Sequence, residues 1–258
     1  MKRTFFLWLF IAAAFFASGQ GKTLYTVNFV KPKAGMRSAF ETNWKAHLAK
    51  FHKTEDKRMV YEVVSGSRIG EYHIVEGPIG YADMDTERPN AKDHGLDLEK
   101  NFSPYLEDER LNGTFRHDDT ASFNGSVTAE KFQVTITHLK MGTQQATMRE
   151  SRRGSLIQAK LNPTPTFSGN TYVQIMQGTK SVMVQIRNLK DGFKELDNRY
   201  FPPNPNTPAP GTNPFKDAYI KDYGQEAWDA RSKLLDNNAN IESREVYLMK
   251  LRKDLSSQ

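Results

Sequence analysis

Residues 66–85 read GSRIGEYHIVEGPIGYADMD, and residues 178–197 read GTKSVMVQIRNLKDGFKELD. The two segments align without a gap at a spacing of 112 residues, with glycine, hydroxyl, basic, aromatic and acidic positions recurring in register. Apolar residues on both sides of a glycine turn predict a β-hairpin in each segment. Solenoid repeats usually have periods of about 20–50 residues, so this longer spacing predicts two copies of one domain.

The composition narrows the class of protein. The 258 residues carry a formal net charge of +6, with basic and acidic residues interleaved along the chain. A nucleic-acid-binding surface would cluster Lys and Arg on one face, so we expect no nucleic-acid partner. The sequence has no Cys, which excludes disulfides, a cysteine nucleophile and a Cys-ligated metal site.

The first residues have the pattern of an export signal. A basic pair, Lys2-Arg3, precedes an apolar run at residues 5–16, and Ala17-Ser18-Gly19 supplies small residues for cleavage. The run is too short to span the roughly 30 Å hydrocarbon layer as a helix. We therefore expect a signal peptide at residues 1–19, a periplasmic or secreted mature chain starting at Gln20, and no membrane anchor after cleavage.

The remaining chain predicts the same element order twice. Each half contains a strand, a helix, two strands forming a hairpin, a helix and a closing strand, which is the split βαβ plan. The predicted first domain covers residues 20–126. The predicted second domain covers residues 127–258 and includes a Pro-rich loop at 202–214. Residues 85–130 give the weakest pattern, with one helix broken by Pro104 and a short closing strand somewhere in 114–123.

This double plan resembles the dimeric α/β-barrel superfamily in a form where both halves are fused in one chain. The resemblance rests on element order and on the repeat. It implies an α+β fold of two tandem ferredoxin-like βαββαβ units, whose antiparallel sheets pack as a pseudo-dimeric barrel. It also implies a monomer with internal pseudo-symmetry. The superfamily includes monooxygenases, haem-degrading and haem-peroxidase-like proteins, and stress-response proteins.

Strand alternation sorts the side chains into two faces. Tyr25, Val27 and Phe29, with their counterparts Phe132, Val134 and Ile136, form an apolar face that we expect to meet the helices. Tyr72, Ile74, Val184 and Ile186 are expected on the same face. The more polar face, with Thr26, Asn28, Gln133, Thr135 and Thr137, is expected to line the space between the two sheets.

Four residues on the expected polar face are candidates for a site between the sheets. His73 is the candidate catalytic residue, because an imidazole titrates near neutral pH. Glu71, Gln185 and Arg187 are candidate ligand-binding residues, with Gln185 as the counterpart of His73 in the 112-residue repeat. The alternative is a hydrogen-bonded polar layer without a ligand, because buried polar groups pair with one another.

No residue set predicts a metal site. His117-Asp118-Asp119, with His94, has carboxylate and imidazole ligands but no recognised spacing, so a charged loop is preferred. His47 falls on or beside the apolar stripe of a helix and is interpreted as a core or partly exposed residue without a ligand. No nucleophile elbow or phosphate-binding loop appears.

Two functions therefore stay open. The first is an exported binding or interaction module, motivated by the lack of a catalytic constellation. The alternative is a small-molecule oxygenase-like or haem-binding enzyme, motivated by the resemblance and by His73. The cofactor is unknown at this point, and the expected partner is a small-molecule ligand between the sheets.

Overall fold

The computed structural model describes residues 21–53, 57–87, 90–107, 111–125, 129–162, 168–174, 181–197, 213–236 and 239–257. Three sequence predictions fall wholly or partly outside these residues. They are the signal peptide at 1–19, most of the Pro-rich loop at 202–214, and the turn at 178–180 of the second hairpin.

The described strands close into one eight-stranded barrel in which every neighbouring pair is antiparallel. The order around the barrel is β1-β3-β2-β8-β5-β7-β6-β4, and β4 pairs with β1 to close it. The strands are β1 (Leu24–Val30), β2 (Arg58–Gly66), β3 (Tyr72–Ile79), β4 (Leu111–His117), β5 (Lys131–Leu139), β6 (Ser168–Gln174), β7 (Ser181–Leu189) and β8 (Ile241–Leu251).

Each half of the chain contributes four consecutive strands to the barrel. The first half supplies β4-β1-β3-β2, and the second half supplies β8-β5-β7-β6. The halves join along two seams, where β2 pairs with β8 and β4 pairs with β6. Closure leaves no free sheet edge among these strands, which removes the usual route to edge-to-edge aggregation.

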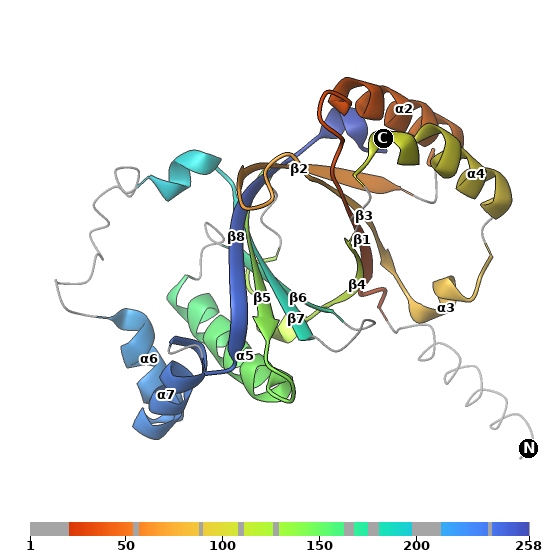
Figure 1. Cartoon of the computed structure of the whole chain (residues 1–258). Helices are drawn as coiled ribbons and strands as arrows, with labels where there is room; N and C mark the ends of the chain where they lie inside the picture. The colour runs from red at the N-terminus through yellow and green to blue at the C-terminus, as the bar shows by residue number, and fades with distance from the viewer. Residues whose placement is uncertain are drawn as a thin grey trace, which may run out of the picture.

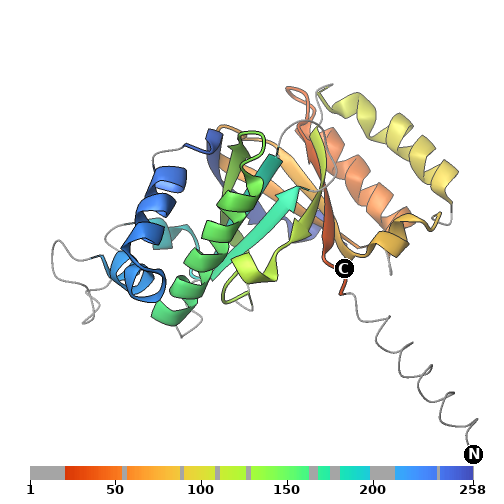
Figure 2. The ribbon, with the colours of Figure 1, turned by 90° about the horizontal axis from the view of Figure 1, so that it is seen from below.

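The described residues form six α-helices, and five of them lie outside the barrel in two groups (Figures 1 and 2). The helices α2 and α4 cover the first half, and α5, α6 and α7 cover the second. No helix in the described part of the chain has the length and apolar character to cross a membrane. The helices are α2 (Arg37–Phe51), α3 (Tyr81–Met84), α4 (Ala91–Asn101), α5 (Gln144–Leu161), α6 (Pro214–Tyr223) and α7 (Gln225–Arg231).

The sequence predicted one helix at 215–235, but the structure divides it. Gly224 has φ of 88°, outside the right-handed helical region, and it separates α6 from α7. Glycine adopts this backbone conformation at little cost, so it ends α6 and restarts the chain at an angle. A π-helical turn, Ser232–Asp236, then completes the segment.

The helix α2 is held to the first half by its apolar stripe. Phe40, Trp44 and Leu48 are buried against the outer face of the sheet, where Tyr72 and Ile74 also point. Spacing of three and four residues places all three on one helical face. Burial of such a side chain contributes about 1.5–3 kcal/mol each.

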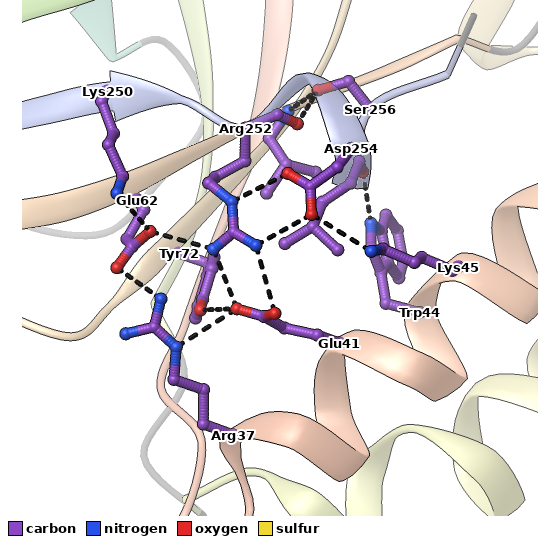
Figure 3. A network of polar contacts seen from close by, with 12 residues as sticks. Arg37, Glu41, Trp44, Lys45, Glu62, Tyr72, Lys250, Arg252, Asp254 and Ser256 are labelled. Carbon is purple, nitrogen blue, oxygen red and sulfur yellow. Dashed lines mark hydrogen bonds and ion pairs between the residues drawn. The ribbon is translucent and has the colours of Figure 1, made fainter.

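The end of the second half is fastened to the first half by a polar network (Figure 3). Arg252, directly after β8, contacts Glu41 of α2 at 2.8 Å and Glu62 of β2 at 2.9 Å. Farther along, the Trp44 indole donates a hydrogen bond to the Leu255 carbonyl at 2.8 Å. The C-terminal segment therefore packs beneath α2 and bridges the two halves.

Candidate functional site

The barrel encloses a cavity of about 490 Å³. Alternate residues of each strand point inward, and those at the cavity are mostly aromatic or β-branched. The lining residues include Tyr25, Val27, Phe29, Tyr61, His73, Phe115, Phe132, Val134, Tyr172, Val184, Tyr247 and Met249. This size and apolar character match those of small-molecule pockets.

The expected orientation of the apolar face is wrong. Tyr25, Val27 and Phe29 point into the barrel, as do Phe132, Val134 and Ile136 and also Val184 and Ile186, instead of meeting the helices. Tyr72 and Ile74 do meet the helices. Alternation fixes which residues share a face of one strand. It does not fix which face turns inward when helices cover the outside and a closed barrel needs an apolar interior.

His73 is a buried titratable group of this cavity. Its side chain is 5% exposed, and its ring lies edge-on to Phe29 and Tyr247, with centroids 4.5 and 5.4 Å away. Among the described residues its Nε2 atom has no hydrogen-bond partner, and the Glu71 carboxylate is 3.9 Å away. Burial, with a smaller contribution from the positive charge of Arg68, lowers the pKa of His73 to about 3. The imidazole is therefore neutral at physiological pH.

Three tyrosines form a second polar feature of the same cavity. Tyr25 and Tyr172 meet edge to face with centroids 5.4 Å apart, and Tyr61 lies across the barrel against Phe132. Burial raises the pKa of each of these phenols. They remain protonated at neutral pH, so each can donate an O–H to an oxygen atom of a ligand.

Glu71 lies at the charged end of the barrel and not among the residues that line the central cavity. Arg68 contacts Glu71 at 3.3 Å and Glu245 of β8 at 2.8 Å, and its guanidinium lies over the Phe29 ring. Glu71 lines a separate polar pocket of about 320 Å³ at this end. Burial raises the pKa of the Glu71 carboxyl, although the Arg68 charge opposes the shift. These ion pairs lie next to His73, whose Nε2 atom is 3.9 Å from the Glu71 carboxylate.

Gln185 and Arg187 are on the outer face of β7, contrary to the prediction that they share a pocket with His73. They line a different cavity of about 640 Å³ beneath α5 and α6, where Arg187 lies 3.6 Å from Glu195. Thr135 and Gln133, also expected between the sheets, line this outer cavity as well.

Gln185 faces outward because the sequence repeat and the structural repeat differ by one residue. His73 pairs with Phe29, and the residue that pairs with Ile136 in the second half is Val184. The spacing of structurally equivalent residues in this strand is therefore 111, and the ungapped alignment gave 112. In a strand, a shift of one residue turns the side chain to the opposite face of the sheet.

Three histidines missed as a group lie together outside the barrel. His47, His52 and His94 approach one another between α2 and α4, and one ring nitrogen from each lies within 4.8 Å of the other two. His94 does not join His117-Asp118-Asp119. Asp118 instead caps a short helical turn and contacts Arg152 at 2.7 Å, and His117 contacts Asp119 at 2.8 Å. No spacing rule links residues 47–52 to residue 94. Asp97 lies three residues after His94, on the same face of a helix, and this pair is a sequence signal that could have marked His94 as a candidate ligand.

Comparison with known proteins supports the fold through structure alone. No family model matches the chain, and no curated protein matches it. A candidate monooxygenase from Lactobacillus acidophilus aligns with a TM-score of 0.51 and 7% identity over 92% of this chain and 97% of that one. Another from Fusobacterium nucleatum aligns with a TM-score of 0.52 and 13% identity over 91% and 94%. An anthrone oxidase-like protein aligns with a TM-score of 0.53 and 9% identity over 90% and 92%.

The fold is that of the dimeric α/β barrels: an α+β chain with a closed eight-stranded antiparallel barrel. The main functional hypothesis, a binding module without catalytic activity, is corrected by this comparison. The solved structures that share the fold are monooxygenase-like and oxidase-like proteins. These structures agree better with the alternative hypothesis, a small-molecule oxygenase-like or haem-binding enzyme.

Proposed function

We propose that this protein is an oxygenase-type enzyme that binds an apolar aromatic molecule inside the barrel and uses His73 as its base. One observation carries the proposal. A buried imidazole nitrogen without a hydrogen-bond partner among the described residues belongs to a side chain that lines an otherwise apolar cavity of about 490 Å³. Buried polar atoms in folded proteins are nearly always paired, so this nitrogen calls for a partner, and a ligand bound in the cavity is the partner that we propose.

The cavity suits a flat aromatic substrate with an oxygen substituent. Phe29, Phe115 and Phe132 offer ring faces and edges, while Tyr61 and Tyr172 offer hydroxyl donors. A ketone or enolate oxygen would accept hydrogen bonds from these phenols. The apolar wall excludes water, which strengthens each of these polar contacts.

The proposed reaction begins with proton abstraction from a carbon made acidic by a conjugated carbonyl, as in an anthrone. The His73 imidazole accepts this proton and becomes an imidazolium, while the substrate becomes a delocalised anion. Dioxygen then oxidises that anion and the imidazolium returns its proton to the reduced oxygen, so that overall a CH₂ group and O₂ give a C=O group and one water. His73 is a weak base because burial disfavours its cation, but the substrate anion formed beside it compensates that charge.

Haem does not fit the described residues. The barrel cavity has imidazoles but no Lys or Arg in its lining to pair with propionates. The outer cavity beneath α5 has Arg187, Arg231 and Arg244 in its lining but no His to ligate iron. We therefore derive no step through haem.

Oxygen uptake with anthrone as the probe tests the proposal. The mature protein should consume O₂ and form the corresponding quinone, identified by mass spectrometry. His73→Gln should lower kcat/KM by about 10²–10⁴, which is the usual contribution of a general base. Gln keeps hydrogen-bonding capacity at a similar volume, and circular dichroism would establish that the variant is folded.

Two control variants sharpen the result. Gln185→Ala changes the residue that the sequence repeat matched to His73, but it lies on the outer face and should leave turnover unchanged. His117→Gln removes the other cavity imidazole, which is bound to Asp119, and should retain most turnover. Equal turnover by folded His73→Gln and wild type would refute the role of His73.

The organisation of the chain belongs to the same proposal. We propose two fused ferredoxin-like units at residues 20–126 and 127–258, in a monomeric chain exported after removal of residues 1–19. The strand orders β4-β1-β3-β2 and β8-β5-β7-β6 support the tandem arrangement. Intact-mass analysis of exported protein should give a chain that starts at Gln20, and a mass that retains Met1 would contradict export processing.

A further inference from the structure

His47, His52 and His94 come from two helices that lie side by side outside the barrel (Figures 1 and 2). His47 is in the next-to-last turn of α2, His52 is its C-cap residue, and His94 is in the first turns of α4. His47 and His52 are 2% exposed, and His94 is half-buried. The β1 and β3 strands separate this group from the barrel cavity, because Asn28 and Ile74 face it while Phe29 and His73 face inward.

The three imidazoles converge through their Nε2 atoms. His52 Nε2 is 3.2 Å from His47 Nε2 and 3.2 Å from His94 Nε2. Nitrogens bound to one zinc ion at about 2.0–2.1 Å in a tetrahedral arrangement are separated by about 3.3 Å. Two of the three nitrogen pairs therefore have the spacing of a shared ligand sphere, and one ligand nitrogen from each ring lies within 4.8 Å of the others.

Hydrogen bonding between the rings accounts for only part of this convergence. An imidazole nitrogen carries either one N–H or one in-plane lone pair. His52 Nε2 faces two other ring nitrogens, so it can form a normal hydrogen bond with one of them and not with both. A cation in the centre accepts the lone pairs of all three nitrogens at once.

An acidic residue orients the first of these rings. His47 Nδ1 donates a hydrogen bond to Asp97 Oδ2 at 2.8 Å, which leaves the lone pair of a neutral His47 on Nε2. Asp97 is in turn held by Asn101 at 3.1 Å and lies 3.5 Å from Lys50. A carboxylate behind a ligating histidine is the usual second layer of metal sites, where it fixes the tautomer and raises the basicity of the ligand.

We propose that His47, His52 and His94 bind one divalent transition-metal ion, with Asp97 as the residue that positions His47. Three imidazoles without thiolate favour Zn²⁺, Fe²⁺, Cu²⁺ or Ni²⁺ over Mg²⁺ or Ca²⁺. Three protein ligands leave at least one coordination position, as in catalytic zinc sites. A cavity of about 250 Å³, lined in part by these histidines with Asn28 and Asn112, gives that position room for water or a small ligand. This site does not depend on the function proposed for the barrel.

Metal binding by tag-free mature protein tests this inference. After removal of metal with a chelator, the protein is dialysed against Zn²⁺ or Co²⁺ and analysed by elemental mass spectrometry. We expect one ion per chain and the intense visible absorption of Co²⁺ in a four-coordinate site. Addition of azide to the Co²⁺ form should change that absorption, because an exchangeable position is open.

Matched variants locate the ion. His52→Ala and His94→Ala should abolish stoichiometric binding, and Asp97→Asn should weaken it about 10- to 100-fold. His117→Ala removes a histidine outside the group and should leave binding unchanged. Because His52 is buried, His94→Gln at the half-buried position serves as a second variant, with circular dichroism to establish folding. Wild-type protein that takes up no ion, or binding that survives in both His94 variants, would overturn the proposal.

Discussion

Replacing Arg252 by Met should destabilise the junction between the two halves of the chain. Arg252 is 15% exposed and makes paired contacts with Glu41, at 2.8 and 3.1 Å, and with Asp254, at 2.9 Å each (Figure 3). It also contacts Glu62 at 2.9 Å. Met keeps much of the apolar stem but removes the charge and every one of these hydrogen bonds.

The magnitude follows from what remains after the substitution. Breaking a buried ion pair by removing one partner usually costs about 3–5 kcal/mol. Here Glu62, whose side chain is 7% exposed, keeps Arg37 at 2.6 Å and Lys250 at 3.3 Å, and Glu41 keeps Arg37 at 3.2 Å. We therefore expect a loss of about 2–3 kcal/mol. For a chain of this size that loss lowers Tm by roughly 5–10 °C.

The pH dependence of this loss gives a second readout. Hydrogen bonds from Arg252, with further ones from Tyr72 and Arg37, lower the pKa of Glu41 to about 2 from its ordinary value of 4.5. A carboxyl whose folded-state pKa is lowered stabilises the protein above its ordinary pKa and loses that contribution as pH falls through the folded value. The difference in the free energy of unfolding between wild type and Arg252→Met should therefore have its full value at pH 7 and decrease between about pH 5 and pH 2.

Thermal unfolding followed by circular dichroism at several pH values is the assay. Lys92→Met, an exposed change on α4, is the control and should alter stability by no more than about 0.5 kcal/mol. A double-mutant cycle with Glu41→Gln would isolate the coupling between Arg252 and Glu41. An Arg252→Met variant as stable as the control, or a deficit that stays constant down to pH 3, would refute this account of the network.

Three further predictions concern the backbone, a buried hydrogen bond and the site. Gly66→Ala should lower the free energy of unfolding, measured with urea, by about 3 kcal/mol, because φ is +101° and the new Cβ would lie 2.7 Å from a backbone carbonyl of β8. Gly35→Ala has φ of +77° but open space around it, so it should lower the same free energy by only about 1 kcal/mol. Tyr219→Phe should cost about 1.5–3 kcal/mol in the same assay, because the buried Tyr219 hydroxyl donates to the buried Glu150 carboxylate. The acid limb of kcat/KM that reports His73 should lie near pH 3, since burial keeps this imidazole neutral above that value; a limb near pH 6.5 that disappears in His73→Gln would contradict this.

The sequence predicted element order better than orientation. Period-two alternation around Tyr25 and Phe132 correctly marks β1 and β5, and the stripe through Phe40, Trp44 and Leu48 correctly marks α2. Both signals are local, because strands and helices repeat over two and 3.6 residues. Which face of the sheet turns inward depends on closure of the barrel, and the sequence of a single strand does not determine it.

The candidate site shows the same limit. His73 lines a cavity, but its expected partner Gln185 faces away from it, because a difference of one residue between the halves turns the side chain to the other face of the strand. The histidine group joins His52 to His94, a separation of 42 residues that only the packing of α2 against α4 brings together. The Arg252 network joins residues 190 and 211 positions apart, and complementary charge alone does not select those partners.

The proposed function rests on proton transfer to His73, and an anaerobic mixing experiment measures that step alone. Wild-type protein mixed with anthrone without O₂ should generate the absorption of the anthrone anion, because the base and the hydroxyl donors are present and the oxidant is not. The folded His73→Gln variant should bind anthrone without forming the anion. Formation of the anion at equal rate in both proteins, or its absence in a wild type that still consumes O₂ with anthrone, would contradict the assignment of His73 as the base.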